Sequence, residues 1–318
     1  MTLRLVFFGT PEFAATALRR LLRSRHQVVG VVTQPDRPRG RGQKLAPGAV
    51  KSVAEEALLP VLQPERLKVA AFQDALSAVD ADLGVVAAYG RILPEAVIAT
   101  PRLGLINIHA SILPRYRGAA PVHRAVIAGE AETGVSIMRV VRELDAGPVF
   151  AVGTRAIGPE ETSEEVERAL AEIGAELCVN VVDDLAQGTA REVPQDDRLA
   201  TYAPRLTKAE GVLDWRRSAI ELHNRVRGLH PWPLAQAALG GERLLVLRTG
   251  LASHETPGAP GEVVHAAGDE FLVATGNGTL RILELQPEAR RAMRAREFLA
   301  GRRVKPGMRF DVPAESPT

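Results

Sequence analysis

The chain has 318 residues, of which 46% are hydrophobic and 25% charged, as in folded globular proteins with two domains or one large one. Its single cysteine, Cys178, excludes an intramolecular disulfide and a cysteine-rich zinc site. No apolar run is long enough to cross a bilayer, and a predicted strand starts near the N-terminus without room for a signal peptide. We therefore expect a cytoplasmic protein.

The net charge of +2 conceals an uneven distribution along the chain. Residues 205–310 contain 17 basic and 11 acidic side chains, an excess of 6, whereas the preceding residues are close to neutral. A basic C-terminal third indicates a polyanionic partner such as a nucleic acid, although a solvated surface has the same composition.

The first half of the sequence alternates short apolar runs with helical patterns. The continuous runs rich in Val, Ile and Leu predict buried parallel strands, at Arg4–Phe8, Val28–Thr33, Leu83–Ala88 and Leu105–His109. The clearest helix is predicted over Pro11–Arg23, with Thr10 as its N-cap. This alternation predicts an α/β fold with a doubly wound, mostly parallel sheet.

Two further strands are predicted at Ser136–Val141 and Val149–Ile157, on either side of a turn that contains Asp145. A long helix over Thr162–Leu185 follows, and Thr162 with Glu165 forms a plausible capping box. We expect Cys178 to be buried in this helix. The polar segment 189–205 lacks periodicity and is predicted to be a linker between domains 1–188 and 206–318.

The C-terminal domain is predicted to be mostly β, with one helix near Ser218–Arg227. Its short strands are separated by glycines, which favours a small barrel. They are expected at Leu244–Arg248, Gly261–His265, Phe271–Ala274 and Thr279–Glu284.

The first strand–helix turn argues against a dinucleotide cofactor. It reads Phe8-Gly9-Thr10-Pro11-Glu12 and lacks the second and third glycines of the dinucleotide-binding fingerprint. Glu12 would also repel a phosphate at the start of the helix. We therefore expect no nicotinamide or flavin at this position.

The most informative pattern lies at the end of the Leu105–His109 strand. Asn107 and His109 stand two residues apart, so they share one face of the strand, and a loop with two arginines and a glycine follows. Further along the chain, Asp145 supplies a carboxylate in a predicted turn. An amide, an imidazole and a carboxylate at the carboxyl end of a parallel strand suggest acyl-type chemistry.

Several motifs, taken in their order along the chain, indicate a resemblance to a known protein family. Phe8–Ala14, Thr33–Pro38, Arg115–Pro121 and Pro231–Pro233, together with Asn107-x-His109, the Ser111–Pro114 loop and Asp145-x-Gly147, are similar to those of the folate-dependent formyltransferases. The resemblance covers nearly the whole chain. It implies a Rossmann-like catalytic domain over 1–188 and an open β-barrel, similar to an oligonucleotide-binding fold, over 206–318.

The resemblance also implies roles for the polar residues. Asn107 would donate a hydrogen bond to the oxyanion of a tetrahedral intermediate. His109 would donate to the same oxyanion, position the amine or move protons, and Asp145 would orient His109 or relay protons through water. No metal is expected, and His109, His123 and Asp145 make an improbable metal site because formyl transfer needs no Lewis acid.

The formyl donor implied is 10-formyltetrahydrofolate, used as a substrate. The folate would bind at the loop and at the neighbouring strand end, through Ser111, Ile112, Leu113, Pro114, Tyr89 and Gly90. Tyr89 could instead be a packing residue. Arg115 and Arg117 could contact a phosphate or the glutamate carboxylates of folate, or could pair within the loop.

Two basic regions favour initiator methionyl-tRNA as the acceptor. The first is a loop after the second strand, where Arg41 is the best match to the family's arginine that reads the acceptor stem. The second is the basic C-terminal domain, including Lys208 near its start. The predicted tRNA-binding residues are Arg37, Arg39, Arg41, Lys44, Lys208, Arg290, Arg291, Arg302 and Arg303.

Two alternatives remain at this point. A folate-dependent formyltransferase acting on an amino-sugar nucleotide would share both domains, but would not need the basic loop. A non-catalytic RNA-binding protein would leave Asn107, His109 and Asp145 unexplained. We expect a monomer without membrane association.

Overall fold

A computed structural model of the chain describes residues 1–39, 44–254 and 256–311. These residues form two compact units. The first comprises residues 1–121, 132–155 and 167–204, and the second comprises residues 122–131, 156–166 and 205 onwards. None of the helices in the described ranges is long and apolar enough to span a membrane. The expected division at residues 188 and 205 stays a prediction.

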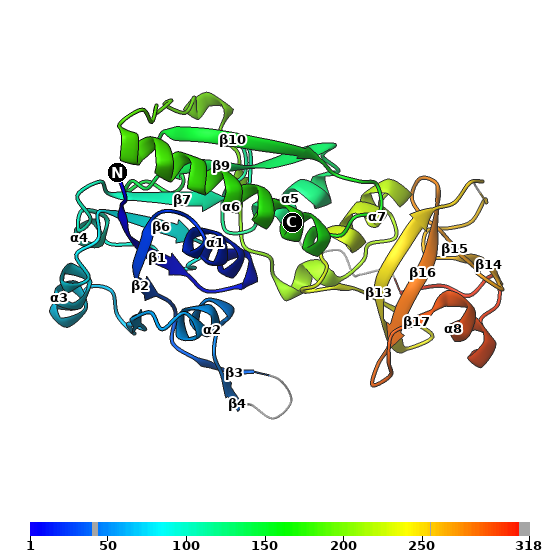
Figure 1. The fold of residues 1–318 in the computed structure, drawn as a ribbon. Helices are drawn as coiled ribbons and strands as arrows, with labels where there is room; N and C mark the ends of the chain where they lie inside the picture. Colours follow the sequence, from blue (N-terminus) through cyan, green and yellow to red (C-terminus); the bar gives the residue numbers. More distant parts are fainter. Residues whose placement is uncertain (40–43, 255, 312–318) are drawn as a thin grey trace. The chain divides into compact units, whose positions relative to one another are not determined.

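A twisted sheet forms the centre of the first unit (Figure 1). Its described strands are β10 (Val149–Ala156), β9 (Glu132–Arg139), β7 (Leu105–His109), β6 (Leu83–Ala87), β1 (Arg4–Gly9), β2 (Gln27–Val32) and β5 (Val61–Leu62), in that order. The strands from β7 to β5 run parallel, and β9 runs antiparallel to β7. The predicted α/β fold is confirmed, and the short β5 is an addition to it.

Helices cover both faces of this sheet. They are α1 (Glu12–Leu22), α2 (Ala49–Glu56), α3 (Ala70–Ala78), α4 (Glu95–Ile98) and α6 (Ser163–Gln187). Predicting Thr10 as the N-cap of α1 was wrong, because Pro11 holds that position and makes no side-chain cap. The Thr10 hydroxyl lies instead near the Tyr89 carbonyl, at 3.5 Å. The Thr162–Glu165 capping box at α6 is confirmed, with the Thr162 N–H bonded to the Glu165 carboxylate at 2.7 Å.

The two faces of β7 have different partners. Leu105 belongs to the apolar cluster that α3 and α4 form with β1 and β6. Ile108 points the other way, towards α6, where a Cβ on Gly174 would lie 2.8 Å from its side chain. Because side chains alternate along a strand, Asn107 and His109 lie on the Leu105 face, opposite α6.

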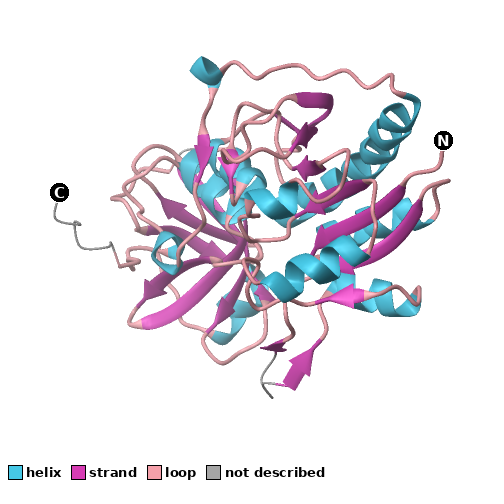
Figure 2. Cartoon of the chain, turned by 90° about the vertical axis from the view of Figure 1, so that its left-hand side faces the viewer, coloured by secondary structure: helices cyan, strands magenta, loops and turns pink. Residues whose placement is uncertain are grey.

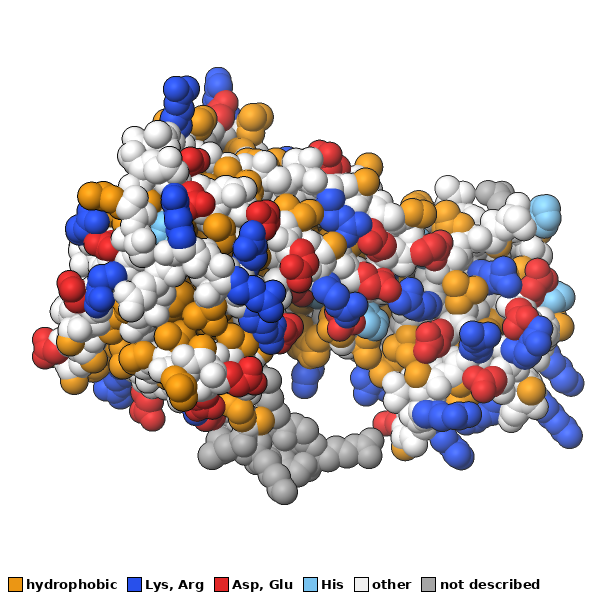
Figure 3. Space-filling model, viewed as in Figure 1, with side chains coloured by type: hydrophobic (Ala, Val, Ile, Leu, Met, Phe, Trp, Pro, Cys, Tyr) orange, Lys and Arg blue, Asp and Glu red, His pale blue; other side chains and the backbone are white. Residues whose placement is uncertain are grey.

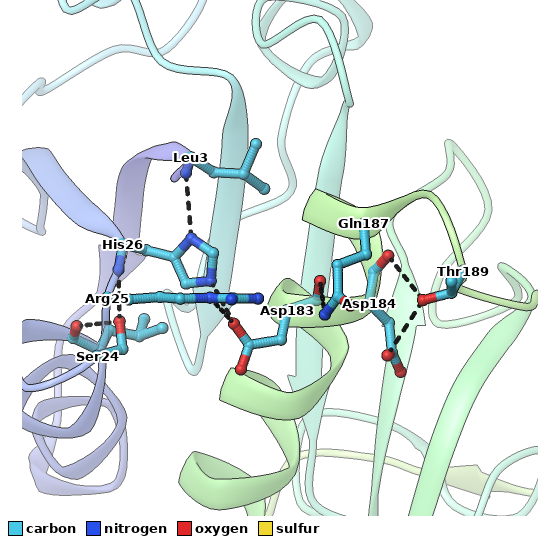
Figure 4. Close-up of polar contacts among 9 residues, drawn as sticks. Leu3, Ser24, Arg25, His26, Asp183, Asp184, Gln187 and Thr189 are labelled. Atoms are coloured by element: carbon cyan, nitrogen blue, oxygen red, sulfur yellow. Dashed lines mark hydrogen bonds and ion pairs between the residues drawn. The ribbon is translucent and has the colours of Figure 1, made fainter. Parts of the chain in front are cut away.

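A polar cluster fixes the end of α6 to the beginning of the sheet (Figure 4). The buried His26 ring accepts the Leu3 N–H at Nδ1 (3.1 Å), so its Nε2 carries the proton that it donates to Asp183 (2.9 Å). Arg25 also binds Asp183, at 2.6 Å. Burial raises the pKa of the Asp183 carboxyl, but the His26 and Arg25 hydrogen bonds outweigh it and leave that pKa below its usual value.

The segment predicted as a linker is ordered against the first unit. Figure 2 shows it as a long loop that runs from the end of α6 to one helical turn, η1 (Asp197–Leu199). Val193 pairs with Val149, and β11 (Tyr202–Ala203) pairs in parallel with β8 (Arg117–Gly118). This part of the chain therefore lies beside the loop that follows β7.

The second unit is built on an antiparallel sheet with a single apolar core. Its described strands follow the order β12 (Ala235–Leu239), β13 (Glu242–Leu251), β16 (Thr279–Pro287), β15 (Glu270–Ala274) and β14 (Val263–Ala267), and β17 (Met293–Arg294) pairs with β16. Two helices, α7 (Ala219–Gly228) and α8 (Ala295–Gly301), contribute to the core, in which the Trp215 and Phe310 rings pack at a tilt with their centroids 4.7 Å apart. The predicted small β-domain is confirmed, whereas β12 and α8 were not predicted. The unit also includes most of α5 (Pro121–Ala128).

Candidate active site

The end of β7 presents the two polar side chains that the sequence singled out. His109 is buried, and Asn107 is partly exposed. The Asn107 carboxamide makes no hydrogen bond to any residue that the structure describes, whereas Ile106 and Ile108 beside it are buried on the other face. An amide that the fold does not use is available to a substrate.

The hydrogen bonds of His109 define its orientation. Its Nε2 lies 3.0 Å from the Tyr116 carbonyl oxygen, which can only accept, so Nε2 carries a proton. Its Nδ1 faces the Asp145 carboxylate at 3.7 Å, which is longer than a hydrogen bond. In neutral His109, Nδ1 is thus an unprotonated acceptor directed towards Asp145.

Asp145 lies in the connection between β9 and β10, folded back beside β7. Its backbone has φ +50°, in the left-handed region that non-glycine residues rarely adopt. Its carboxylate accepts the Gly118 N–H at 2.8 Å, and its side chain is 14% exposed. The structure therefore brings Asn107, His109 and Asp145 to one place, as the sequence predicted for the first two by their spacing.

The loop of residues 111–114 uses most of its polar groups to hold its own shape. The Ser111 hydroxyl donates to the Arg115 carbonyl at 2.6 Å. Ser136 of β9 donates to the Ser111 carbonyl (2.8 Å) and accepts the Leu113 N–H (3.1 Å). Ser111 and Leu113 are buried, whereas Ile112 and Pro114 are partly exposed.

Tyr89 and Gly90 follow the neighbouring strand, β6. The Tyr89 ring is 2% exposed and packs edge-on against Phe8, with centroids 5.8 Å apart, and burial raises the pKa of its phenol. Its carbonyl accepts a hydrogen bond from the Gln34 amide at 2.7 Å. Gly90 has φ +78°, and a Cβ there would lie 2.7 Å from the same amide.

Arg117 pairs within the protein, which was one of the two roles considered for it. Its side chain is buried and binds Gln195, at 2.7 and 3.1 Å, and Asp197, at 2.7 Å. It is therefore not exposed to a phosphate. Arg115 is exposed, with its guanidinium 5.3 Å from the centre of the Tyr116 ring.

The predicted acceptor-stem loop is a hairpin of β3 (Arg37–Arg39) and β4 (Lys44–Ala46). Arg41 lies outside the described residues, and Arg39 and Lys44 are placed by their backbone only. At the base of the hairpin, Asp36 binds Lys51 at 2.5 Å and Gln63 at 2.9 Å, and the Lys51 bond lowers the pKa of its carboxyl. The hairpin is thus anchored to the carboxyl edge of the sheet.

The predicted basic residues of the second unit differ in their partners. Arg302 binds Glu242 at 2.6 Å, and Arg291 lies 3.7 Å from Glu297. Exposed Arg290, Arg303 and Lys208 form no ion pair with any residue in the described ranges. On the face shown in Figure 3, basic side chains of this unit stand among acidic ones.

Sequence reasoning missed the residues that brace the site from a distance. Thr201 accepts the Tyr116 N–H at its hydroxyl (2.8 Å) and donates its own N–H to the Pro114 carbonyl (3.3 Å). Ser136 likewise binds the backbone of the 111–114 loop, and Gln195 binds the backbone of the turn at Asp145. Lone Ser, Thr and Gln residues carry no motif, so no sequence signal pointed to them. The described residues contain no group of three or more His, Cys, Asp or Glu suited to a metal ion.

Comparison with known proteins identifies the family. The formyl transferase family model matches residues 3–182, and the model for the C-terminal domain of formyl transferases matches residues 205–303. A methionyl-tRNA formyltransferase of Pseudomonas fluorescens is 49% identical over 303 residues, with 95% of each chain covered. The chain belongs to the methionyl-tRNA formyltransferase family. Another relative of that name, from Geobacter metallireducens, is 43% identical and covers 97% of this chain and 98% of its own.

Solved structures share the fold at lower sequence identity. HypX from Aquifex aeolicus, in a complex with tetrahydrofolic acid, is 17% identical with a TM-score of 0.66, over 94% of this chain and 47% of its own. An N-formyltransferase from Helicobacter canadensis, solved with folinic acid and dTDP-3-aminofucose, is 15% identical with a TM-score of 0.65, over 89% and 98%. At these identities the likeness concerns the fold alone.

Proposed function

We propose that this chain transfers the formyl group of 10-formyltetrahydrofolate to the α-amino group of initiator methionyl-tRNA, giving N-formylmethionyl-tRNA. The observation that carries this proposal is the meeting of Asn107, His109 and Asp145, with the Asn107 amide left unpaired by the fold. The names of the relatives, which match nearly the whole chain, support methionyl-tRNA as the acceptor.

Asn107 is assigned to the oxyanion. Attack of the amine on the formyl carbon gives a tetrahedral intermediate with a negatively charged oxygen, and a side-chain N–H donor stabilises it without changing protonation. The strand holds Asn107 rigidly because Ile106 and Ile108 are buried on either side of it. A fixed donor needs no reorganisation as the charge develops.

His109 and Asp145 are assigned to the attacking amine. With Nε2 donating to Tyr116, the Nδ1 of neutral His109 and the Asp145 carboxylate are two acceptors 3.7 Å apart. One amine nitrogen can donate to both, which orients its lone pair and provides acceptors for the proton that it loses. The folate nitrogen gains a proton as it leaves.

Folate is assigned to the 111–114 loop and the end of β6. Because Ser111 and Leu113 are buried and the Tyr89 ring lies in the core, contact falls to Ile112, Pro114 and backbone groups at Tyr89 and Gly90. The shape of this surface depends on Ser136, which holds the loop backbone from the adjacent strand.

Residues 1–188 are proposed as the catalytic domain, and residues 206–318 as a tRNA-binding domain joined to it through residues 189–205. We further propose that the protein works as a monomer and that it acts in the cytoplasm. Arg37, Arg39, Arg41 and Lys44 would reach the acceptor stem.

The direct test is formylation of charged initiator tRNA. Purified protein, 10-formyltetrahydrofolate and methionyl-tRNA should give N-formylmethionyl-tRNA, and the Asp145→Asn variant should give at least about 100-fold less product per unit time. An amino-sugar nucleotide offered under the same conditions should not be formylated. Formylation of the sugar nucleotide without formylation of tRNA would overturn the proposal.

The tRNA surface of the second unit is tested by salt dependence. Three substitutions remove exposed charges that have no ion-pair partner in the described ranges: Arg290→Gln, Arg303→Gln and Lys208→Gln. A fourth, Arg302→Gln, instead removes a charge that is already paired with Glu242. Each lost phosphate contact should reduce the slope of log affinity against log salt by roughly 0.7–0.9. A triple variant with an unchanged slope would exclude these residues as phosphate contacts.

A further inference from the structure

The carboxamide of Gln195 connects the two loops that form the candidate active site. Its Oε1 accepts from Nε and Nη2 of Arg117, at 3.1 and 2.7 Å. Its Nε2 donates to the carbonyl oxygens of Asp145 and Gly147, at 2.9 and 2.7 Å. All four hydrogen-bonding positions of the amide are used, and since Arg only donates and a carbonyl only accepts, the amide has one possible orientation.

The turn that Gln195 holds needs an external restraint. Asp145 has φ +50°, in a region that residues other than glycine adopt only rarely, and Leu144 before it is exposed and gives the turn little packing. The turn keeps the carboxylate within 2.8 Å of the Gly118 N–H and 3.7 Å from His109. Without a restraint, relaxation of the backbone would move the carboxylate away from His109.

Arg117 gives the restraint a fixed base. It is buried, is bound by Gln195 and Asp197, and directly precedes Gly118, whose N–H binds the Asp145 carboxylate. Gln195 therefore ties the backbone of the Asp145 turn to the strand that receives the Asp145 side chain. Gln195 thus binds the backbone carbonyl of Asp145, while the Gly118 N–H binds its side-chain carboxylate.

We propose that Gln195 is a positioning residue for formyl transfer, which holds the Asp145 carboxylate opposite His109 through the Asp145 and Gly147 carbonyls. The assignment rests on the proposed function of Asp145. Because its amide is fully bonded within the protein, we assign Gln195 no contact with either substrate. Its effect should therefore appear in the chemical step rather than in substrate binding.

Three variants separate the contacts. Gln195→Met keeps the length of the side chain and removes all four hydrogen bonds. Gln195→Glu keeps the acceptor for Arg117 but places an oxygen against two carbonyls. The matched control is Gln187→Met, because Gln187 is an exposed residue at the end of α6 with one 3.2 Å bond to a backbone carbonyl. We expect both Gln195 variants to lower kcat roughly 10- to 100-fold, with both KM values nearly unchanged, and the control to retain full activity.

Two measurements distinguish positioning from general destabilisation. Hydrogen exchange of the Gly118 amide should accelerate at least about tenfold in both Gln195 variants, while the neighbouring Ala119 amide, bonded to the Ala203 carbonyl at 2.9 Å, should not change. In an Asp145→Asn background, Gln195→Met should cost almost no further activity, since both changes act through one carboxylate.

The outcomes also separate this inference from the proposed function. Exchange is measured without substrate, so a wild-type protein that fails to formylate tRNA would overturn the function and leave the exchange result standing. Wild-type kcat in Gln195→Met would overturn the positioning role. So would equal acceleration at Gly118 and Ala119, or an undiminished loss in the Asp145→Asn background.

Discussion

Replacement of Asn107 by alanine should separate catalysis from stability. The carboxamide is partly exposed and makes no hydrogen bond to any described residue, so its removal leaves no buried polar group without a partner. The apolar residues on either side, Ile106 and Ile108, keep their burial on the opposite face of β7. We therefore expect the free energy of unfolding to fall by less than about 1 kcal/mol.

The catalytic loss should be much larger. Removing one oxyanion donor costs about 2.7–4 kcal/mol, or roughly 100- to 1000-fold in kcat, because no water replaces a fixed donor as the charge develops. Initial rates of N-formylmethionyl-tRNA formation and urea unfolding curves measure the two quantities on the same preparations. Asn180→Ala, at an exposed position of α6, is the matched control.

The reasoning would be refuted in either of two ways. A variant at Asn107 that keeps more than about a tenth of the wild-type kcat does not lack the main oxyanion donor. A loss of stability above roughly 2 kcal/mol would show that the amide supports the fold, and the kinetic effect could then be structural.

Three further predictions follow from local geometry. Gly147→Ala should destabilise the protein by about 1–3 kcal/mol and reduce activity, because a Cβ would lie 2.0 Å from the Arg139 carbonyl oxygen; wild-type thermal stability would contradict this. The pKa of Glu165 is lowered to about 2, chiefly by the Thr162 N–H, so its contribution to stability is present above pH 4.5 and lost as pH falls towards 2. Glu165→Gln should flatten the acid dependence of unfolding over that interval, and an unchanged pH profile would exclude this contribution. Burial raises the pKa of the Cys178 thiol to about 12, so iodoacetamide should label it only at the rate of unfolding, and rapid labelling of native protein would disagree.

The sequence was most informative where signals are local. The strand Leu105–His109 was predicted with the bounds that the structure has, since a continuous apolar run of this length forms a buried strand. The spacing of Asn107 and His109 placed both on one face because side chains alternate in any strand. The capping box at Thr162 could also be predicted, since both of its partners lie within four residues of the sequence.

Local signals failed where a residue's partner is distant in the sequence. The Thr10 hydroxyl lies near a carbonyl 79 residues away instead of capping its own helix. Residues 189–205 have no periodicity, so their sequence gave no sign that Val193, Thr201 and Tyr202 pair with earlier segments of the first unit. Their hydrogen bonds are to backbone groups, which every residue has, so side-chain patterns did not reveal them.

The sequence by itself therefore determined the fold class, the polar pair on β7 and, through ordered motifs, the family. The tertiary structure decided which nitrogen of His109 faces Asp145, and that Arg117 is a buried internal partner rather than a substrate contact. It also decided that Gln195 joins the two loops. The physical reason is that the periodicity and spacing of residues are properties of the linear chain. A hydrogen bond between segments distant in the sequence forms only after the sheet has brought those segments together.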